Sequence, residues 1–133
     1  MHAHGLAMPE PIAGDWLAAT GDAAGRAILA HGQATAVFVA NDQMSLGLLH
    51  ACHDAGVRVP DDLSVIGFDD IPEAAYFTPP LTTMRQDFDG LGRDIMATVL
   101  DVLRDEPSAP DRTARVPELV VRASTVALGY AAE

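Results

Sequence analysis

The sequence predicts an α/β fold with a mainly parallel sheet and flanking helices. Two short runs, residues 35–40 and 63–68, are apolar at successive positions, as strands covered on both faces are. Between and around them lie segments whose apolar residues recur every three or four positions, which indicates helices. Strands that alternate with helices favour parallel pairing with right-handed crossovers.

Residues 15–31 form the first predicted helix. Asp15 is a suitable cap for its start, because a carboxylate accepts hydrogen bonds from the free N–H groups of a first turn. Gly32 is a suitable stop, because glycine adopts the left-handed conformation that ends many helices. The strand at 35–40 follows directly.

Residues 42–55 form a second predicted helix, which ends at Gly56. Its apolar residues fall into two stripes, so one side can pack on the sheet and the other needs a further partner. Simple burial between two layers explains the second stripe equally well. The first stripe contains Met44, Leu48, Ala51 and Ala55, and the second contains Leu46, Leu49 and His53.

The second half of the chain adds three elements. Residues 81–86 are extended, with two β-branched threonines. Residues 87–104 form the clearest amphipathic helix, with acidic residues at its start. Residues 115–122 form a last strand, which Pro117 places at a sheet edge, since proline cannot donate to a ladder.

Polar residues stand where two predicted strands end. Asn41 follows the first strand and Asp69 the second, so both emerge at the edge where parallel sheets bind ligands. With Trp16 and Gln86 they suit a polyol, because planar amides and carboxylates engage adjacent hydroxyls and an aromatic face contacts a sugar ring. The alternatives are that Asp42 only caps a helix and that Asp70 only caps a turn.

Composition argues against several functions. The formal net charge is −11 and the eight basic residues are scattered arginines, so we expect no direct contact with nucleic acid and none with a membrane. The single cysteine, the missing signal peptide and the absence of a long apolar span predict a cytoplasmic protein. Glycine-rich phosphate motifs and zinc-ligand spacings are missing, so no cofactor and no metal is expected. We also expect no enzyme, since Asp69 and Asp70 point apart on an extended strand, as Cys52 and His53 do on a helix.

Four segments together resemble the effector-binding domain of the lac repressor family of transcription regulators. The resemblance runs from about Pro11 to Leu128, and the segments follow the family's order and spacing. It is strongest to galactoside-responsive members. The segments are GDW at 14–16, VANDQMSLG at 39–47, RVPDDLSVIGFDD at 58–70 and PPLTTMRQDFDGLG at 79–92.

The resemblance implies a fold like the type I periplasmic binding proteins, present here as one partial domain over residues 1–133. Residues 11–86 and 112–128 correspond to an incomplete C-terminal subdomain. Residues 87–105 correspond to a crossover helix that in the family packs in the N-terminal subdomain, which this chain lacks. The DNA-binding helix-turn-helix of the family is missing as well.

The resemblance also implies a role for single residues. Trp16 stacks on the sugar, Asn41 and Asp69 bind its hydroxyls, and Asp42 supports the start of the helix. Gln86 assists in binding, and Phe88 lines the pocket. The implied dimer interface contains Leu46, Leu49, His50, His53 and Tyr76.

We therefore expect the effector-sensing and dimerising part of a lac-repressor-type regulator, with a weakly bound, galactoside-like sugar as effector. The strand at 35–40 has an exposed edge and helix 88–104 an uncovered face, which predicts a homodimer or larger assembly, with elements exchanged between chains. Two alternatives stay open. One is a free-standing dimerisation module without effector binding, and the other is a sugar carrier of the same fold.

Overall fold

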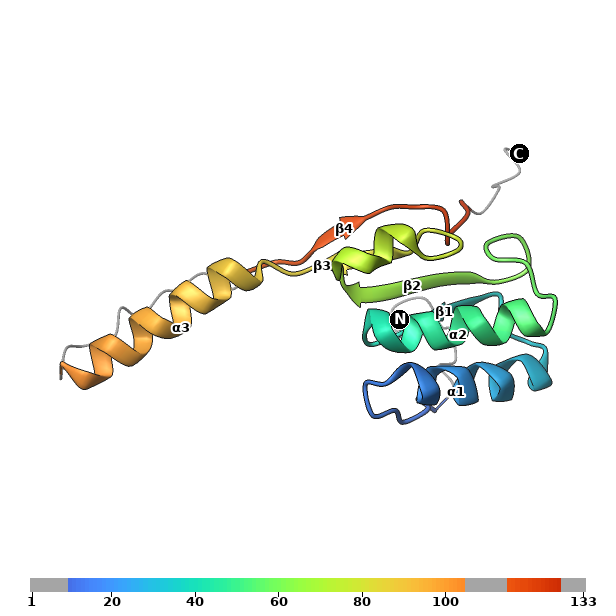
Figure 1. The fold of residues 1–133 in the computed structure, drawn as a ribbon, viewed down its shortest axis with the longest axis horizontal. Coiled ribbons are helices and arrows are strands. Elements are labelled where there is room, and N and C mark those ends of the chain that lie inside the picture. Colours follow the sequence, from blue (N-terminus) through green and yellow to red (C-terminus); the bar gives the residue numbers. More distant parts are fainter. Residues whose placement is uncertain (1–9, 105–114, 128–133) are drawn as a thin grey trace, which may run out of the picture.

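The computed structural model describes residues 10–104 and 115–127 (Figure 1). Its centre is a four-stranded sheet in the order β1-β2-β3-β4. The first three strands pair in parallel and β4 runs antiparallel to β3, so the predicted α/β fold with a mainly parallel sheet is confirmed. The strands are β1 (Ala36–Phe38), β2 (Ser64–Asp69), β3 (Thr82–Arg85) and β4 (Glu118–Val120).

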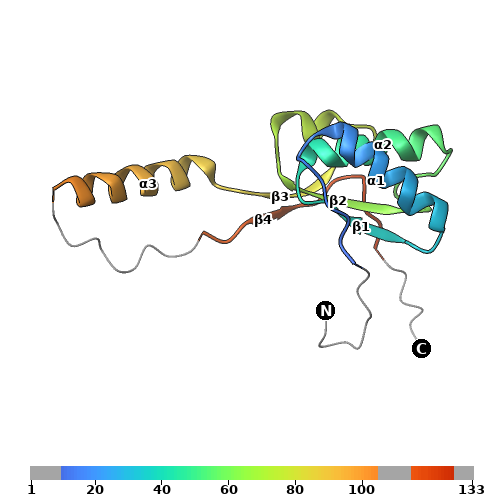
Figure 2. The same cartoon turned by 90° about the horizontal axis from the view of Figure 1, so that it is seen from below.

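Three helices lie on one face of this sheet, and a fourth projects away from its end (Figures 1 and 2). The three predicted α-helices are present, with ends within a few residues of the predicted ones. The short 3-10 helix η2 was not predicted. The helices are α1 (Ala18–His31), α2 (Asp42–Asp54), η2 (Pro72–Tyr76) and α3 (Phe88–Leu103).

The ends of α1 confirm one predicted cap and correct the other. Gly32 has φ 65° and its N–H donates to the carbonyl of Ile28, so it ends the helix as predicted. Asp15 does not cap the helix, because Leu17 occupies the capping position. The carboxylate of Asp15 instead accepts from the Leu17 N–H (3.1 Å) and the Thr20 hydroxyl (2.6 Å), which folds the preceding turn.

The core lies between the sheet and the helices on its covered face. Leu49 is 5% exposed and belongs to this core, although the sequence placed it in the second, outward stripe of α2. Leu46 and His53 of that stripe are exposed. Simple burial, the alternative that the sequence left open for this stripe, thus applies to Leu49 but not to Leu46 or His53. The core cluster contains Leu48, Leu49, Cys52, Leu63, Val65, Ala74, Phe77 and Leu81.

Two apolar surfaces are exposed among the described residues. One is the face of the sheet opposite the helices. Val37 and Val65 pack on the covered side, so Phe38 and Phe68, one and three positions further on, lie on the other face, where their rings meet edge to face at 6.4 Å between centroids. The other is the surface of α3, which projects beyond the sheet. The exposed large apolar residues of α3 are Phe88, Leu91, Ile95, Met96, Val99, Leu100, Val102 and Leu103.

β1 and β4 form the two edges of the sheet, as predicted for the strand at 35–40 and for the strand after Pro117. The predicted boundaries at residues 1, 105, 112 and 128 lie outside the described residues. Among the helices that the structure describes, none has the length and apolar character needed to cross a membrane.

Candidate functional site

The carboxyl ends of the parallel strands bring the predicted binding residues to one edge of the sheet. Phe38 of β1 is in register with Ile66 of β2, so Asn41 and Asp69, each three residues further on, leave the sheet at the same level. Asp69 is in register with Arg85 of β3, and Gln86 follows at once. Parallel sheets bind their ligands at this edge.

Asp69 and Gln86 form the first pair at this edge. The side-chain amide of Gln86 donates to Oδ1 of Asp69 at 2.9 Å. Both residues are only partly buried. The backbone of Asp69 has φ 107°, a conformation that residues with a side chain rarely adopt. The carboxylate is therefore held in a defined direction while part of it stays open to solvent.

Trp16 and Asn41 form the second pair. The side-chain amide of Asn41 donates to the carbonyl of Trp16 (3.0 Å) and to Oε1 of Gln43 (3.0 Å). The backbone of Trp16 is left-handed, with φ 72°, and its indole is 64% exposed. Asn41 thus anchors the turn that presents the indole, and Phe88, 52% exposed, begins α3 two residues after Gln86.

Asn41, not Asp42, caps α2, which corrects the role that the sequence assigned to Asp42. Oδ1 of Asn41 accepts from the Met44 N–H at 2.9 Å. Asp42 is fully buried and accepts from the Thr83 hydroxyl (2.7 Å) and the Ile71 N–H (2.9 Å), so it ties α2 to β3 and to the start of η2. Burial raises the pKa of this carboxyl, although both hydrogen bonds oppose the rise.

Asp70 does not cap the turn that follows it. Its side chain is 6% exposed and accepts from Arg85 and from Arg122, each at 2.6 Å. Burial alone raises the pKa of the Asp70 carboxyl, but the hydrogen bonds from the two guanidinium groups outweigh this effect and lower the pKa below its usual value. Asp70 is therefore a charged structural link between the ends of β2, β3 and β4.

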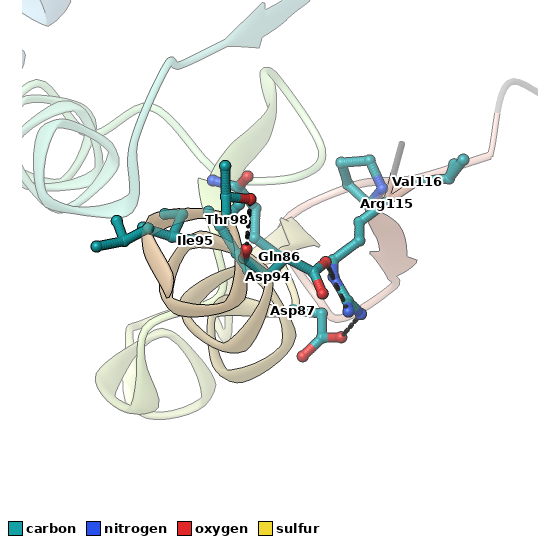
Figure 3. Close-up of a pocket in the computed structure, with 10 residues that line it drawn as sticks. Gln86, Asp87, Asp94, Ile95, Thr98, Arg115 and Val116 are labelled. Atoms are coloured by element: carbon teal, nitrogen blue, oxygen red, sulfur yellow. Dashed lines mark hydrogen bonds and ion pairs between the residues drawn. The ribbon is translucent and has the colours of Figure 1, made fainter. Parts of the chain in front are cut away.

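A hollow of about 460 Å³ lies beside this edge, between α3 and the segment that leads into β4 (Figure 3). Arg115 bridges its two walls by pairing with Asp87 and Asp94 of the α3 side. Sequence reasoning missed Arg115, because these pairs span 28 and 21 residues and no local spacing signals them. The lining residues are Gln86, Asp87, Leu91, Asp94, Ile95, Thr98, Val99, Arg115, Val116 and Pro117.

The residues predicted for a dimer interface are only partly on the surface. Tyr76 is 87% exposed and Leu46 45% exposed, and His53 is exposed as well. His50 is exposed and contacts Asp22 of α1 through Nδ1 at 2.9 Å. Leu49 lies in the core and cannot contact a partner directly. Within the described ranges no group of three or more histidine, cysteine, aspartate or glutamate side chains is arranged to hold a metal ion.

A mainly parallel sheet with helices on its face and polar side chains at its carboxyl edge is the arrangement found in α/β ligand-binding domains. The sequence model of one protein family, the periplasmic binding protein-like domain, matches residues 1–125 of the chain. The chain belongs to this family, and its homologues are transcription regulators of the lac repressor family.

Three comparisons illustrate the relationship. The chain is 41% identical over 105 residues to the HTH-type transcriptional regulator MalR of Streptomyces coelicolor. The aligned region covers 79% of this chain and 30% of that protein. A lac repressor dimer bound to operator and the anti-inducer ONPF shares 38% identity at a TM-score of 0.76, over 89% of this chain and 42% of that chain. A LacI family regulator from Lactobacillus casei with bound sucrose shares 27% identity at a TM-score of 0.78, over 94% of this chain and 47% of that chain. The chain thus spans less than half the length of each.

Proposed function

We propose that this chain is the effector-sensing and dimerising part of a lac-repressor-type transcription regulator, and that its effector is a sugar of galactoside type. The observation that carries the proposal is backbone strain at the predicted site. Within the described residues, Trp16, Asp69 and Asp70 are the non-glycine residues with positive φ. Such conformations cost about 1–3 kcal/mol each and cluster at functional sites. Two of the three are residues that the family resemblance assigns to the sugar.

The contacts at the edge suit a sugar ring. The exposed indole of Trp16 stacks on the C–H face of the ring. Gln86 engages one oxygen of Asp69, and the other oxygen accepts from a sugar hydroxyl. Asn41 is only 4% exposed, and its side-chain amide already donates to the exposed Gln43 side chain. To bind the sugar, Asn41 exchanges this hydrogen bond for one to a sugar hydroxyl. Phe88 lines the same side.

The isolated chain binds its sugar weakly. Trp16 and Phe88 are more than half exposed, so the ring is covered from one side only. Tight sites enclose most of the ligand surface, and closure strengthens each hydrogen bond by removing water. In a complete regulator of this family, a second subdomain supplies that closure.

The test uses Trp16, which is the only tryptophan in the chain. Its fluorescence is recorded while galactosides, other sugars and a purine base are added, the last as a planar ligand without vicinal hydroxyls. We expect a saturable change with galactosides, abolished by Asp69→Ala and retained in Asp61→Ala, which alters an exposed carboxylate elsewhere. A flat response from a chain that circular dichroism shows to be folded contradicts sugar sensing.

A free-standing dimerisation module is the second candidate, and the exposure of Leu46 and Tyr76 favours it. In this case the chain pairs with intact relatives in the cytoplasm through Leu46, His50, His53 and Tyr76. It catalyses no reaction, needs no cofactor and contacts neither DNA nor membrane itself. An excess of the chain should then change the operator binding of an intact relative, and no change in a mobility-shift titration counts against the module.

A further inference from the structure

We infer that Asp70 is a positioning residue, which holds the neighbouring carboxylate of Asp69 in the direction needed to bind the effector. This inference rests on the proposed sugar-binding function. Arg85 and Arg122 clamp Asp70, and the clamp fixes the backbone at the end of β2.

The carboxylate of Asp70 is nearly buried, and its two arginine partners come from β3 and from the segment after β4. Asp70 accepts from Nε of Arg85 and from Nη2 of Arg122, each at 2.6 Å. Nη1 of Arg122 donates to the carbonyl of Leu81 at 2.7 Å, and its backbone N–H donates to Oγ1 of Thr82 at 2.9 Å. The Arg122 side chain is 17% exposed. Hydrogen bonds between charged groups in such surroundings are short, strong and directional.

The backbone that the clamp restrains is strained. Asp69 and Asp70 have φ values of 107° and 57° in succession. A side chain at positive φ crowds the backbone, so such positions are usually glycine, and the conformation persists only where surrounding contacts impose it. The two charged hydrogen bonds to Asp70, each at 2.6 Å, hold this corner. Their loss allows the corner to relax towards ordinary backbone angles.

The corner and the sugar-binding carboxylate are linked through β3. Arg85 is in register with Asp69, and its side chain binds Asp70. The next residue, Gln86, binds Asp69 at 2.9 Å. Two consecutive residues at the end of β3 therefore hold two consecutive residues at the end of β2, so relaxation at Asp70 turns the Asp69 carboxylate away from Gln86 and from the sugar.

The test compares four variants of the chain. Asp70→Asn removes the charge at nearly constant shape, Arg85→Met removes the half-exposed side of the clamp, and Arg85→Lys restores a charge there. Asp62→Asn is the matched control, because Asp62 forms an equally short pair with Arg58 (2.6 Å) before the other end of β2. Galactoside affinity is read from Trp16 fluorescence, and the position of Asp69 from the NMR signals of the Gln86 side-chain amide without sugar.

We expect Asp70→Asn to lower galactoside affinity about tenfold, since a misplaced binding group loses most of its contact. The Gln86 amide signals should shift in the same variant. Arg85→Met should give a smaller loss that Arg85→Lys repairs, and Asp62→Asn should change neither readout. In a chain that stays folded, a role in stability alone leaves galactoside affinity unchanged, so the affinity and the Gln86 signals together separate positioning from stability.

A folded Asp70→Asn chain with native affinity and unchanged Gln86 signals overturns the inference. If Asp70→Asn does not fold, the same two results for Arg85→Met overturn it. An unsubstituted chain that ignores every sugar overturns the proposed function. In that case shifted Gln86 signals in Asp70→Asn still support the positioning of Asp69, and unchanged signals overturn it as well.

Discussion

At the scale of single residues, Asp42 illustrates how much of the site depends on a buried carboxylate outside it. Asp42 is fully buried, and its two oxygens satisfy the Thr83 hydroxyl and the Ile71 N–H. A Cβ on Gly67 would lie 2.3 Å from Oδ1 of Asp42, so the strand passes directly beneath the carboxylate. Asp42 therefore fixes β2, β3 and η2 relative to the helix that Asn41 caps.

Asp42→Ala should lower the free energy of unfolding by about 2–4 kcal/mol, because two buried polar groups lose their partners at once. Urea unfolding followed by circular dichroism measures the change. Asp61→Ala removes an exposed aspartate from the loop before β2 and should have a much smaller effect. Equal losses in the two variants would show that the buried contacts of Asp42 contribute little.

The sequence proposed residues for the candidate site more readily than it resolved the contacts among them. Trp16, Asn41, Asp69 and Gln86 were proposed because strand ends and family motifs are local patterns. The prediction that Asp42 rather than Asn41 caps the helix was wrong. Both residue types cap helices, so the sequence cannot distinguish two helix starts that differ by one position. The arginine partners of Asp70 lie 15 and 52 residues away, beyond any local pattern.

At the scale of elements, the contact between α1 and α2 depends on missing side chains. A Cβ on Gly47 would lie 1.8 Å from the carbonyl oxygen of Ala18, and one on Gly21 would lie 2.0 Å from that of Met44. Neither separation is possible, so the two helices approach as closely as they do only because both positions are glycine. The turn at Trp16 is carried by this same helix pair.

Gly47→Ala should therefore destabilise the chain, although alanine is the better helix former by about 1 kcal/mol. The control is Gly92→Ala in α3, where no atom lies within 4 Å of the new Cβ and the helix propensity gain should appear unopposed. Thermal unfolding of both variants gives the comparison. If Gly47→Ala stabilises the chain as Gly92→Ala does, the close approach is not required.

The same helix pair should respond to pH through His50. The hydrogen bond to Asp22, followed by the charge of Asp54, raises the pKa of His50 above its ordinary value of 6.5. The pKa of His50 is higher in the folded state, so protonated His50 stabilises the folded chain. This stabilisation is complete below the unfolded-state pKa and disappears as the pH rises through the folded-state pKa. The urea midpoint should accordingly fall as the pH rises above about 6.5.

His50→Gln should flatten that fall, because glutamine carries no titrating charge to Asp22. His53→Gln is the matched control, since His53 lies on the same helix and is also exposed. NMR titration of the histidine signals identifies the group that titrates. A fall in the urea midpoint that persists unchanged in His50→Gln would assign the pH dependence to another residue.

Elements of strong periodicity were predicted with nearly correct ends, while two features depended on tertiary contacts. The 3-10 helix η2 lies between prolines, where the sequence signals a loop, and the Asp42 bond to Ile71 holds its start. Leu49 packs into the core because α2 meets both α1 and the sheet, which a helical stripe alone does not reveal.

At the scale of the whole molecule, the described part of the chain carries apolar surfaces that its helices and strands do not cover. Phe38 is 59% exposed on the open face of the sheet, and Ile95 is 53% exposed on α3. Helix α3 extends away from the sheet, so it cannot cover that face in the same chain (Figure 1). Contiguous apolar surfaces of this kind mark contact sites, and the edge of β1 adds unpaired backbone groups.

The unsubstituted chain should therefore form a dimer or larger assembly in size-exclusion chromatography with light scattering, rather than a species of 14.0 kDa. Ile95→Gln should shift the assembly towards the monomer if α3 forms the contact, and Phe38→Gln should do so if the sheet face forms it. Arg93→Gln, a polar change on the same helix, should leave the mass unchanged. A monodisperse monomer at every concentration would contradict self-association and assign both surfaces to a different partner, because large exposed apolar surfaces mark contact sites.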